Sequence, residues 1–360
     1  MIPISKPFIG DDEKQAVMEV LDSGMLAQGP RTAQLEEKFA EVCGTKHAVA
    51  TSCGTTALHV ALLAHNIAEG DEVITTPFTF QASINSILFV GARPIFVDIE
   101  EDTFNIDPSL IERAISPRTK AIMPVHLYGY VCNMDAIMEI AGRHNLAVIE
   151  DAAQAVGAEL RGQRAGSFGT GCFSLYATKN VMSGEGGMIT TGDEQIAQRC
   201  RMIRNHGMQR RYYHEMLGYN FRMTDLHAAI GLVQLGRLEE FTSRRAANAA
   251  YLSANISSVK TPAVREGYRH VWHQYTIRVS GSGGSATRDV AVKQLNDAGV
   301  GTGIFYPIPA HKQAYLRDHG VEDVSLPVAE QLANEVISLP VHPQLSQADL
   351  ETIAREVNKL

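Results

Sequence analysis

Short apolar, β-branched runs alternate with amphipathic stretches over most of the first 240 residues. This rhythm is typical of strand–helix–strand units around a largely parallel sheet. Seven runs are predicted as strands: 47–51, 72–75, 93–97, 121–125, 147–150, 172–175 and 187–190. The stretches between them are predicted as helices: 34–42, 55–64, 79–89, 134–144 and 193–203. The pattern indicates an α/β fold, with a mostly parallel seven-stranded sheet sandwiched by helices.

The pattern changes near Asn220. Thr224-Asp225 is a suitable cap for a long helix that continues to Phe241, and more charged and alternating segments follow. A chain of 360 residues also exceeds a single compact core, which stops growing at about 250–300 residues. We therefore predict a boundary at 235–245, between a large domain (1–240, with an N-terminal arm over 1–12) and a smaller α+β domain (241–360). In the smaller domain we expect a strand at 274–279, a loop tip at 281–285 and a helix at 289–298.

Composition and charge narrow the class of protein. Hydrophobic residues make up 45% of the chain and charged residues 20%, which favours a large packed core over disorder. The net charge, 32 − 40 = −8, does not favour nucleic-acid binding. No apolar run approaches the ~18–20 residues of a membrane span, and the N-terminus lacks the layout of a signal peptide, so we expect a cytoplasmic protein. The five cysteines are scattered without a Cys-x-x-Cys pair, so no metal site is expected.

Small hydroxyl residues and a glycine follow the first predicted strand, in the sequence Ser52-Cys53-Gly54-Thr55-Thr56. At a helix N-terminus, such residues let backbone N–H groups approach a phosphate, and the helix dipole adds attraction. The alternative is a simple helix cap.

Two carboxylates, Glu150 and Asp151, end the fifth predicted strand. Ligands of parallel α/β sheets bind at the carboxyl ends of the strands, where a buried acid such as Asp151 would meet a cationic ring nitrogen. The alternative is an acid that caps a following helix. The two residues are not expected to act as a paired acid and base, because adjacent strand residues point to opposite faces.

A lysine follows the sixth predicted strand, in Phe173-Ser174-Leu175-Tyr176-Ala177-Thr178-Lys179, with a glycine-rich stretch over 183–187. Burial at this position would lower the pKa of Lys179 and allow its free amine to attack a carbonyl. The alternative is an ordinary surface lysine.

These three segments, in this order, resemble the DegT-type nucleotide-sugar aminotransferases, a branch of the fold type I pyridoxal-phosphate enzymes. The most specific matches are the blocks 150–154 and 179–187. Further landmarks of the family match at 7–30, 126–129, 205–207, 218–223 and 339–343. The resemblance extends over nearly the whole chain.

The resemblance implies a role for each residue around the cofactor ring. Lys179 would hold pyridoxal 5′-phosphate covalently and then move a proton between the amino-bearing carbon and the cofactor's C4′ carbon. Asp151 would keep the pyridine nitrogen protonated, so that the ring acts as an electron sink. Gln154 would contact O3′ of the cofactor. Phe80 would stack on the ring, although core packing is an equally open reading of this phenylalanine.

The resemblance also implies a phosphate site shared between two subunits. Gly54, Thr55 and Ser174 would hold the cofactor phosphate, joined by Asn220 from the other subunit, which implies a homodimer. A loop or helix-capping role remains open for Asn220. The candidate substrate contacts are His206, Arg222 and Tyr306, which ion pairing and packing explain equally well.

The implied activity is transfer of an amino group from L-glutamate, through the pyridoxamine 5′-phosphate form, to the keto group of a nucleotide-diphosphate sugar. A keto-cyclitol of the scyllo-inosose type is an alternative acceptor, since it would use the same catalytic motifs. A non-catalytic sensor on this fold is a second alternative. It would be expected to lack Lys179 or to carry an added DNA-binding helix pair, and the sequence shows neither.

Overall fold

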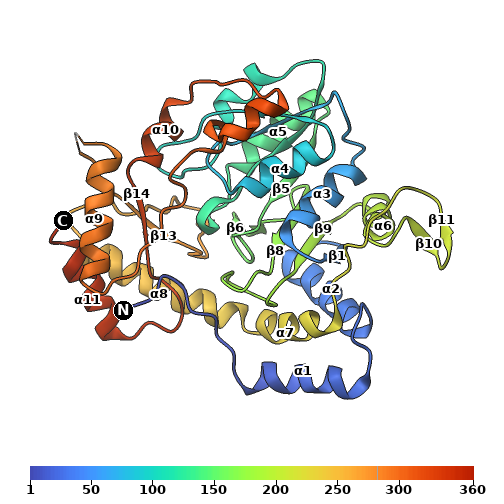
Figure 1. Ribbon diagram of the computed structural model, residues 1–360, viewed down its shortest axis with the longest axis horizontal. Helices are drawn as coiled ribbons and strands as arrows, with labels where there is room; N and C mark the ends of the chain where they lie inside the picture. Colours follow the sequence, from blue (N-terminus) through green and yellow to red (C-terminus); the bar gives the residue numbers. More distant parts are fainter. Residues whose placement is uncertain (282) are drawn as a thin grey trace.

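The computed structural model describes residues 1–281 and 283–360. Its centre is a seven-stranded sheet in the order β1-β9-β8-β5-β4-β2-β3 (Figure 1). Strand β9 runs antiparallel to both of its neighbours, β1 and β8, and the other pairs in the sheet are parallel. The strands are β1 (His47–Thr51), β2 (Glu72–Thr75), β3 (Arg93–Phe96), β4 (Thr119–Met123), β5 (Ala147–Asp151), β8 (Thr170–Ser174) and β9 (Gly187–Thr191). The predicted sheet is confirmed.

Helices cover both faces of this sheet because successive strand residues point to opposite sides. In β1, Ala48 and Ala50 pack into one apolar cluster and Val49 into another. The first cluster includes side chains of α2 (Pro30–Cys43), α5 (Met134–His144) and α7 (Asp225–Gly236). The second includes side chains of α3 (Gly54–Ala64), α4 (Gln81–Phe89) and α6 (Glu194–Ile203). Helix α1 (Asp11–Ser23) packs outside this layer, against α7 (Figure 1).

The long helix predicted from Thr224 to Phe241 is wrong in one respect, since the structure divides it at Arg237. There the backbone leaves the helical region (φ −103°, ψ 6°), between α7 and α8 (Leu238–Asn255). Gly236 favours the break through its low helix propensity. The Arg237 guanidinium lies over the ring of Phe8, 4.1 Å from its centroid, so the N-terminal arm holds the bend.

The remainder of the chain builds a third apolar cluster around a two-stranded sheet. Strands β13 (Tyr275–Arg278) and β14 (Val336–Leu339) pair antiparallel. The cluster includes side chains of both strands and of α8, α9 (Ser285–Asp297) and α11 (Gln347–Val357), with Ile2 of the arm at its edge. Helix α10 (Pro327–Ala333) packs elsewhere, in a cluster with Phe78 and Ile99. The division into domains at residue 240 therefore stays a prediction.

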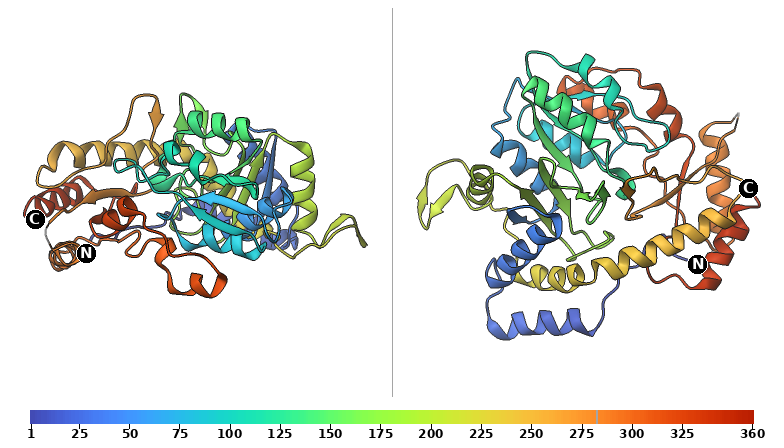
Figure 2. Two further views of the ribbon diagram at one scale, coloured as in Figure 1. Left: turned by 90° about the horizontal axis from the view of Figure 1, so that it is seen from above. Right: turned by 180° about the vertical axis from the view of Figure 1, so that it is seen from behind.

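Smaller elements complete the chain. A hairpin of β10 (Met208–Arg210) and β11 (Tyr213–His214) stands away from the body, on the side opposite both termini (Figures 1 and 2). A small sheet joins β12 (Tyr268–Arg269), β6 (Glu159–Leu160) and β7 (Gln163–Arg164). Short 3₁₀ helices occupy Pro108–Leu110, Glu112–Ala114, Leu127–Gly129, Ala310–Lys312 and Ala314–His319. The predicted loop tip over 281–285 includes residue 282, which lies outside the described residues.

Two kinds of feature are missing from the described residues. Among them, no helix combines the length and apolar character needed to cross a membrane. Within 1–281 and 283–360, no group of three or more His, Cys, Asp or Glu side chains is arranged to hold a metal ion.

Candidate active site

The candidate residues of the first half of the chain gather at one edge of the sheet. Strands β5 and β8 are parallel neighbours, so Asp151 at the end of one and Ser174 at the end of the other share the carboxyl edge. Gly54 opens α3 directly after β1, and its position lies against Ser174. The carboxyl edge of a parallel sheet is where ligands of such folds bind.

Asp151 is a buried acid with acceptor capacity to spare. Its residue is 5% exposed. Its Oδ2 accepts a hydrogen bond from Ser83 Oγ at 2.7 Å, and its Oδ1 accepts one from Ala153 N–H at 3.1 Å. Burial raises the pKa of Asp151, and the bonds from Ser83 and Ala153 and the charge of Lys179 oppose that shift. No α-helix follows it directly, since 152–157 form turns, so the helix-cap alternative does not fit.

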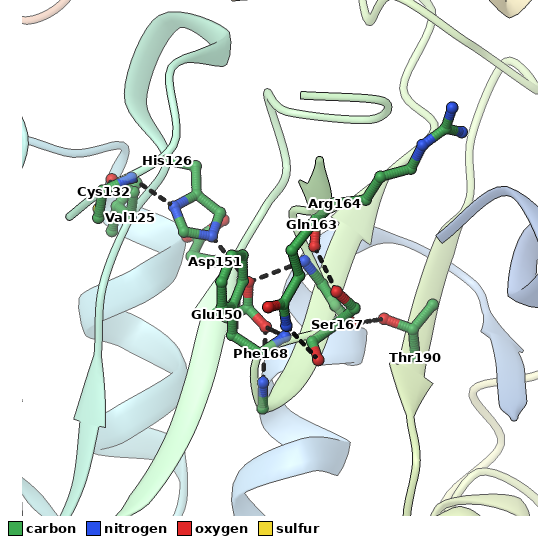
Figure 3. A network of polar contacts seen from close by, with 12 residues as sticks. Val125, His126, Cys132, Glu150, Asp151, Gln163, Arg164, Ser167, Phe168 and Thr190 are labelled. Carbon is green, nitrogen blue, oxygen red and sulfur yellow. Dashed lines mark hydrogen bonds and ion pairs between the residues drawn. The ribbon is translucent and has the colours of Figure 1, made fainter. Parts of the chain in front are cut away.

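Glu150, one residue earlier, faces the other side of the sheet and is fully hydrogen-bonded (Figure 3). Its carboxylate accepts the N–H groups of Gly166, Phe168 and Gly169 at 2.8–2.9 Å and lies 2.9 Å from His126 Nε2. Cys132 N–H donates to His126 Nδ1, so the network assigns the ring proton to Nε2, toward Glu150. Glu150 therefore anchors the loop over 166–169 and is not available as a partner acid for Asp151.

Lys179 lies in the tight turn after β8, where its N–H donates to Tyr176 O at 2.8 Å. Burial lowers the pKa of its amine to about 8, and the negative charge of Asp151 partly opposes the shift. The next residue, Asn180, ties the turn to the 271–273 segment: its Nδ2 donates to Val271 O at 2.8 Å and its Oδ1 lies 3.1 Å from His273 Nδ1. The surface-lysine alternative does not fit an amine in this environment.

Gln154 and Tyr306 connect the turn after β5 to the C-terminal part of the chain. Gln154 Oε1 accepts Tyr128 N–H at 2.8 Å, and its Nε2 donates to the Tyr306 hydroxyl at 3.3 Å. Burial, and then the charge of Asp151, raise the pKa of Tyr306. The ring of Phe80 lies 6.1 Å from that of Tyr306 and its residue is 61% exposed, so the core-packing alternative for Phe80 is wrong.

The start of α3 has the form of an anion site. A Cβ on Gly54 would come within 2.8 Å of Ser174 Cβ, so only glycine allows the helix to begin this close to the end of β8. The first turn leaves the N–H groups of Gly54 and Thr55 without intrahelical acceptors. The same sheet edge carries Lys179 with its lowered pKa, the buried acid Asp151 and the exposed ring of Phe80. Together with the anion site, these residues fit pyridoxal phosphate.

Three predicted residues lie apart from this group. His206 and Asn220 are exposed, and Arg222 Nη1 donates to Asn205 Oδ1 at 2.7 Å. All three belong to the segment that flanks the β10–β11 hairpin. The backbone of the segment contacts the site region, where Ser52 N–H donates to Phe221 O at 2.8 Å. In the described chain, no hydrogen bond joins these three side chains to Lys179, Asp151 or Gln154.

Ser83 is a site residue that the sequence reasoning missed. It lies in the first turn of α4, and its hydroxyl contacts both Asp151 and, at 2.8 Å, Thr79 Oγ1. The available signal was the pair of hydroxyl residues four positions apart, beside Phe80, at the end of the segment that follows β2. That spacing places two side chains on one face of the chain as the helix begins.

Solved structures give the class of protein. The S. venezuelae enzyme DesV, solved in complex with a ketimine intermediate, superposes with a TM-score of 0.92 at 38% identity, covering 97% of this chain and 94% of that one. The PLP-form of the putative sugar aminotransferase Spr1654 from Streptococcus pneumoniae superposes with a TM-score of 0.94 at 29% identity, covering 99% and 98%. Fold and site together define a pyridoxal-phosphate-dependent aminotransferase of fold type I.

Residues 7–358 match the model of the DegT/DnrJ/EryC1/StrS aminotransferase family, and the chain belongs to that family. The GDP-perosamine synthase of Caulobacter vibrioides is 41% identical over 368 residues, covering 100% of this chain and 98% of that protein. The spore coat polysaccharide biosynthesis protein SpsC of Bacillus subtilis is 41% identical over 377 residues, covering 100% and 97%. The resemblance inferred from the sequence is confirmed.

Proposed function

We propose that this enzyme moves an amino group from L-glutamate to the keto group of a nucleotide-diphosphate-linked sugar. The observation that carries the proposal is that Lys179, whose amine has a pKa lowered by burial to about 8, lies close enough to the buried Asp151 for each charge to shift the other's pKa. The choice of acceptor is supported by the 41% identity to a protein named for a GDP-linked amino sugar.

Bound pyridoxal phosphate would supply a carbonyl that captures the donor's amino group and a ring that withdraws electrons. Lys179 is proposed to hold it covalently, and Asp151 to face the ring nitrogen. Gln154 would bind O3′ and Phe80 would cover one ring face. Gly54, Thr55 and Ser174 would surround the phosphate. The chemistry of each residue suits its proposed role. Lys179 is a nucleophile, Asp151 an anion, Gln154 an amide and Phe80 an apolar ring, and the small residues at the start of α3 leave N–H groups free to donate.

The low pKa of Lys179 gives the residue two protonation states within reach. At pH 7 a pKa of about 8 leaves about a tenth of the amine unprotonated, against about one part in three thousand at the ordinary value of 10.5. The amine therefore exists both as a nucleophile and as a proton carrier, which is what a base that moves a proton to and from C4′ requires.

Asp151 is proposed to stay ionised and keep the proton on the ring nitrogen. Its burial disfavours the charge, and the hydrogen bonds from Ser83 and Ala153 compensate. An ionised carboxylate only accepts hydrogen bonds, so a group facing it is held in its protonated form.

A homodimer with shared sites completes the proposal. Asn220 is exposed and near the base of a hairpin that carries exposed Tyr212 and Tyr213 beside Arg210 and Arg211. Tyrosine and arginine are enriched in protein interfaces. We propose that Asn220 of one chain reaches the cofactor phosphate of the other, with His206, Arg222 and Tyr306 as substrate contacts. All five cysteines are free thiols, which supports a reducing compartment and the expected cytoplasmic location.

The first experiment locates the cofactor. Borohydride reduction and peptide mapping should find it on Lys179, and L-glutamate should abolish the visible absorbance of the holoenzyme. Lys179→Ala should remove turnover, while Lys14→Ala, at an exposed lysine paired with Asp11, should behave as wild type. The cofactor on another lysine, or on none, would contradict the assignment.

The second experiment identifies the acceptor and the subunit arrangement. The pyridoxamine form is offered keto sugars on several nucleotides and free keto-cyclitols, and amino products are detected by mass. Conversion of the cyclitols alone would replace the proposed acceptor. Mixing Lys179→Ala with an inactive Asn220 variant under subunit exchange should restore part of the activity, and no recovery despite proven exchange would contradict the shared site.

A further inference from the structure

A small cavity lies between the N-terminal arm and the turn that carries Lys179. It is lined by the arm over 5–8, by the turn over 177–180 and by side chains of α7 and α8, including Arg245. Its volume is about 20 Å³, measured as the space open to the centre of a water molecule. The cavity can therefore hold one water molecule or one ion of similar size, but not a sugar or a nucleotide. The cavity is therefore too small to be the substrate site itself, although it adjoins the turn of Lys179.

The charged residues that line this cavity are all basic. They are Lys6, Lys179 and Arg245, and none of the aspartates and glutamates in the described part of the chain lines it. Buried positive charge without a negative partner is unfavourable, so such groups are normally paired or bind an anion.

Arg245 is the most deeply buried of these positive charges that lacks a negative partner among the described residues. It is 6% exposed, its Nη1 donates to Trp272 O at 3.1 Å, and its Nε is buried without a hydrogen-bond partner. Burial alone lowers the pKa of its guanidinium to about 10, with no carboxylate acting against the shift.

The other buried arginines of the described chain provide an internal comparison. Each has a carboxylate within ion-pair distance: Arg204 pairs with Glu36, Arg278 with Glu101 and Glu335, and Arg288 with Asp289. Arg245 has none among the described residues. Three of the four buried guanidinium groups in the described residues are thus paired with acids. The fourth, that of Arg245, lines the cavity instead.

The titratable groups around Arg245 do not supply the missing charge. His273 and His342 are both buried, and burial and then neighbouring positive charge, including that of Arg245, lower the pKa of each imidazole. Asp349, an acid of the C-terminal segment, accepts hydrogen bonds on its Oδ2 from the N–H and the hydroxyl of Ser346. The charges of His342 and Lys6 also help to lower the pKa of Asp349.

We propose that this cavity binds one small inorganic anion of the halide class, with Arg245 as its principal ligand and Lys6 at the outer side. A water molecule fits the space but leaves the charge uncompensated. A halide both fits the space and compensates the positive charge. It would link the N-terminal arm, α8 and the Lys179 turn, because all three line the cavity. The site does not depend on the proposed substrate.

Bromide is the probe that tests the site directly. Crystals of the holoenzyme soaked in sodium bromide should give an anomalous peak in the cavity, within hydrogen-bond distance of the Arg245 guanidinium. Water at that position, with bromide bound elsewhere on the surface, would overturn the proposal. So would a carboxylate from a second copy of the chain.

Thermal unfolding in sodium chloride and in sodium gluconate, at equal ionic strength, tests the site in solution. Gluconate is too large for the cavity, so chloride should raise the midpoint by about 2–4 °C through binding to the folded state. Arg245→Met should abolish the difference. Arg244→Met, at the neighbouring exposed arginine that pairs with Glu240, should retain it.

An equal chloride effect in Arg245→Met and wild type would contradict the proposal, because the ion would then bind elsewhere. Should Arg245→Met fail to fold, the bromide experiment on the wild-type holoenzyme decides the question alone.

Discussion

Glu150 and Asp151 are consecutive, both buried, and opposite in their surroundings. Glu150 faces four hydrogen-bond donors, three backbone N–H groups and His126, which use the acceptor capacity of its two oxygens (Figure 3). Asp151 accepts one bond on each oxygen, and the charge of Lys179 acts on its pKa. The difference teaches that burial alone does not mark a reactive acid. The acid with unused acceptor capacity beside an ionisable partner is the one suited to chemistry.

The largest expected effect is on the structural side of this pair. In Glu150→Gln, one oxygen becomes an NH₂ group that meets N–H donors, and the remaining donors lose a charged acceptor. A hydrogen bond to a charged group contributes about 1.5–3 kcal/mol. We expect a marked fall in the midpoint of chemical unfolding, whereas Glu139→Gln, at an exposed glutamate, should leave it unchanged. Equal midpoints for Glu150→Gln and wild type would refute this reading.

Asp151→Asn should give the reverse result. Burial raises the pKa of Asp151, so at pH 7 its ionised form lowers the free energy of unfolding. A neutral amide at this position removes that destabilisation. Stability should hold or rise, while kcat falls about 10²–10³-fold, as for loss of one preorganised electrostatic partner. The measurements are unfolding midpoints and turnover on one preparation. Near-normal turnover would leave Asp151 with a structural role, through its hydrogen bonds with Ser83 and Ala153.

Ser83→Ala tests the support beneath Asp151. Its hydrogen bond lowers the pKa of Asp151, so removing it should raise that pKa further and reduce turnover about tenfold, the scale of one hydrogen bond to a charged group. The pH dependence of the holoenzyme's visible absorbance should shift as well. Ser86→Ala, one turn along α4 and bonded only to Ser83 O, is the matched control. A loss of turnover with an unmoved pH profile would indicate a packing role.

The smallest effect concerns Lys179 and needs no substitution. Its amine reacts only when unprotonated, so capture of pyridoxal phosphate by the stripped protein should accelerate about tenfold per pH unit below pH 8 and level off above it. An ordinary lysine would keep accelerating toward pH 10.5. The charge of Asp151 raises the pKa of Lys179, so in Asp151→Asn the plateau should begin at lower pH. Rapid-mixing absorbance measures both, and a plateau beyond pH 10 would contradict the burial argument.

Local pattern was enough to predict most of the sheet. The bounds of β1, β2 and α5 match the predicted ranges to the residue, because strand runs and caps there agree with their packing. The break at Arg237 was not predictable, since its cause includes Phe8, which reaches it from the far end of the sequence. The same reason hides Ser83, whose partner Asp151 is 68 residues away.

In the site, strand ends located Lys179 and Asp151, since both follow apolar runs that end at one sheet edge. The exposed Phe80 could not be separated from a core residue by its sequence, because exposure depends on what the rest of the chain covers. His206, Asn220 and Arg222 stay predictions, because their proposed partners belong to a second chain or to a bound substrate.

The pairing of Ile2 with Val300 has a consequence for the order of folding. Ile2 N–H donates to Gly299 O at 2.7 Å and Gly301 N–H donates to Ile2 O at 2.8 Å, so the contact spans nearly 300 residues of sequence. Contacts between residues so far apart in the sequence form late, because the entropy cost of closing a long loop comes before the contact can stabilise the fold. On a ribosome the arm emerges before the segment around Val300, so it cannot dock until that segment has been made. The residues around Ile2 thus take their places long after their own synthesis.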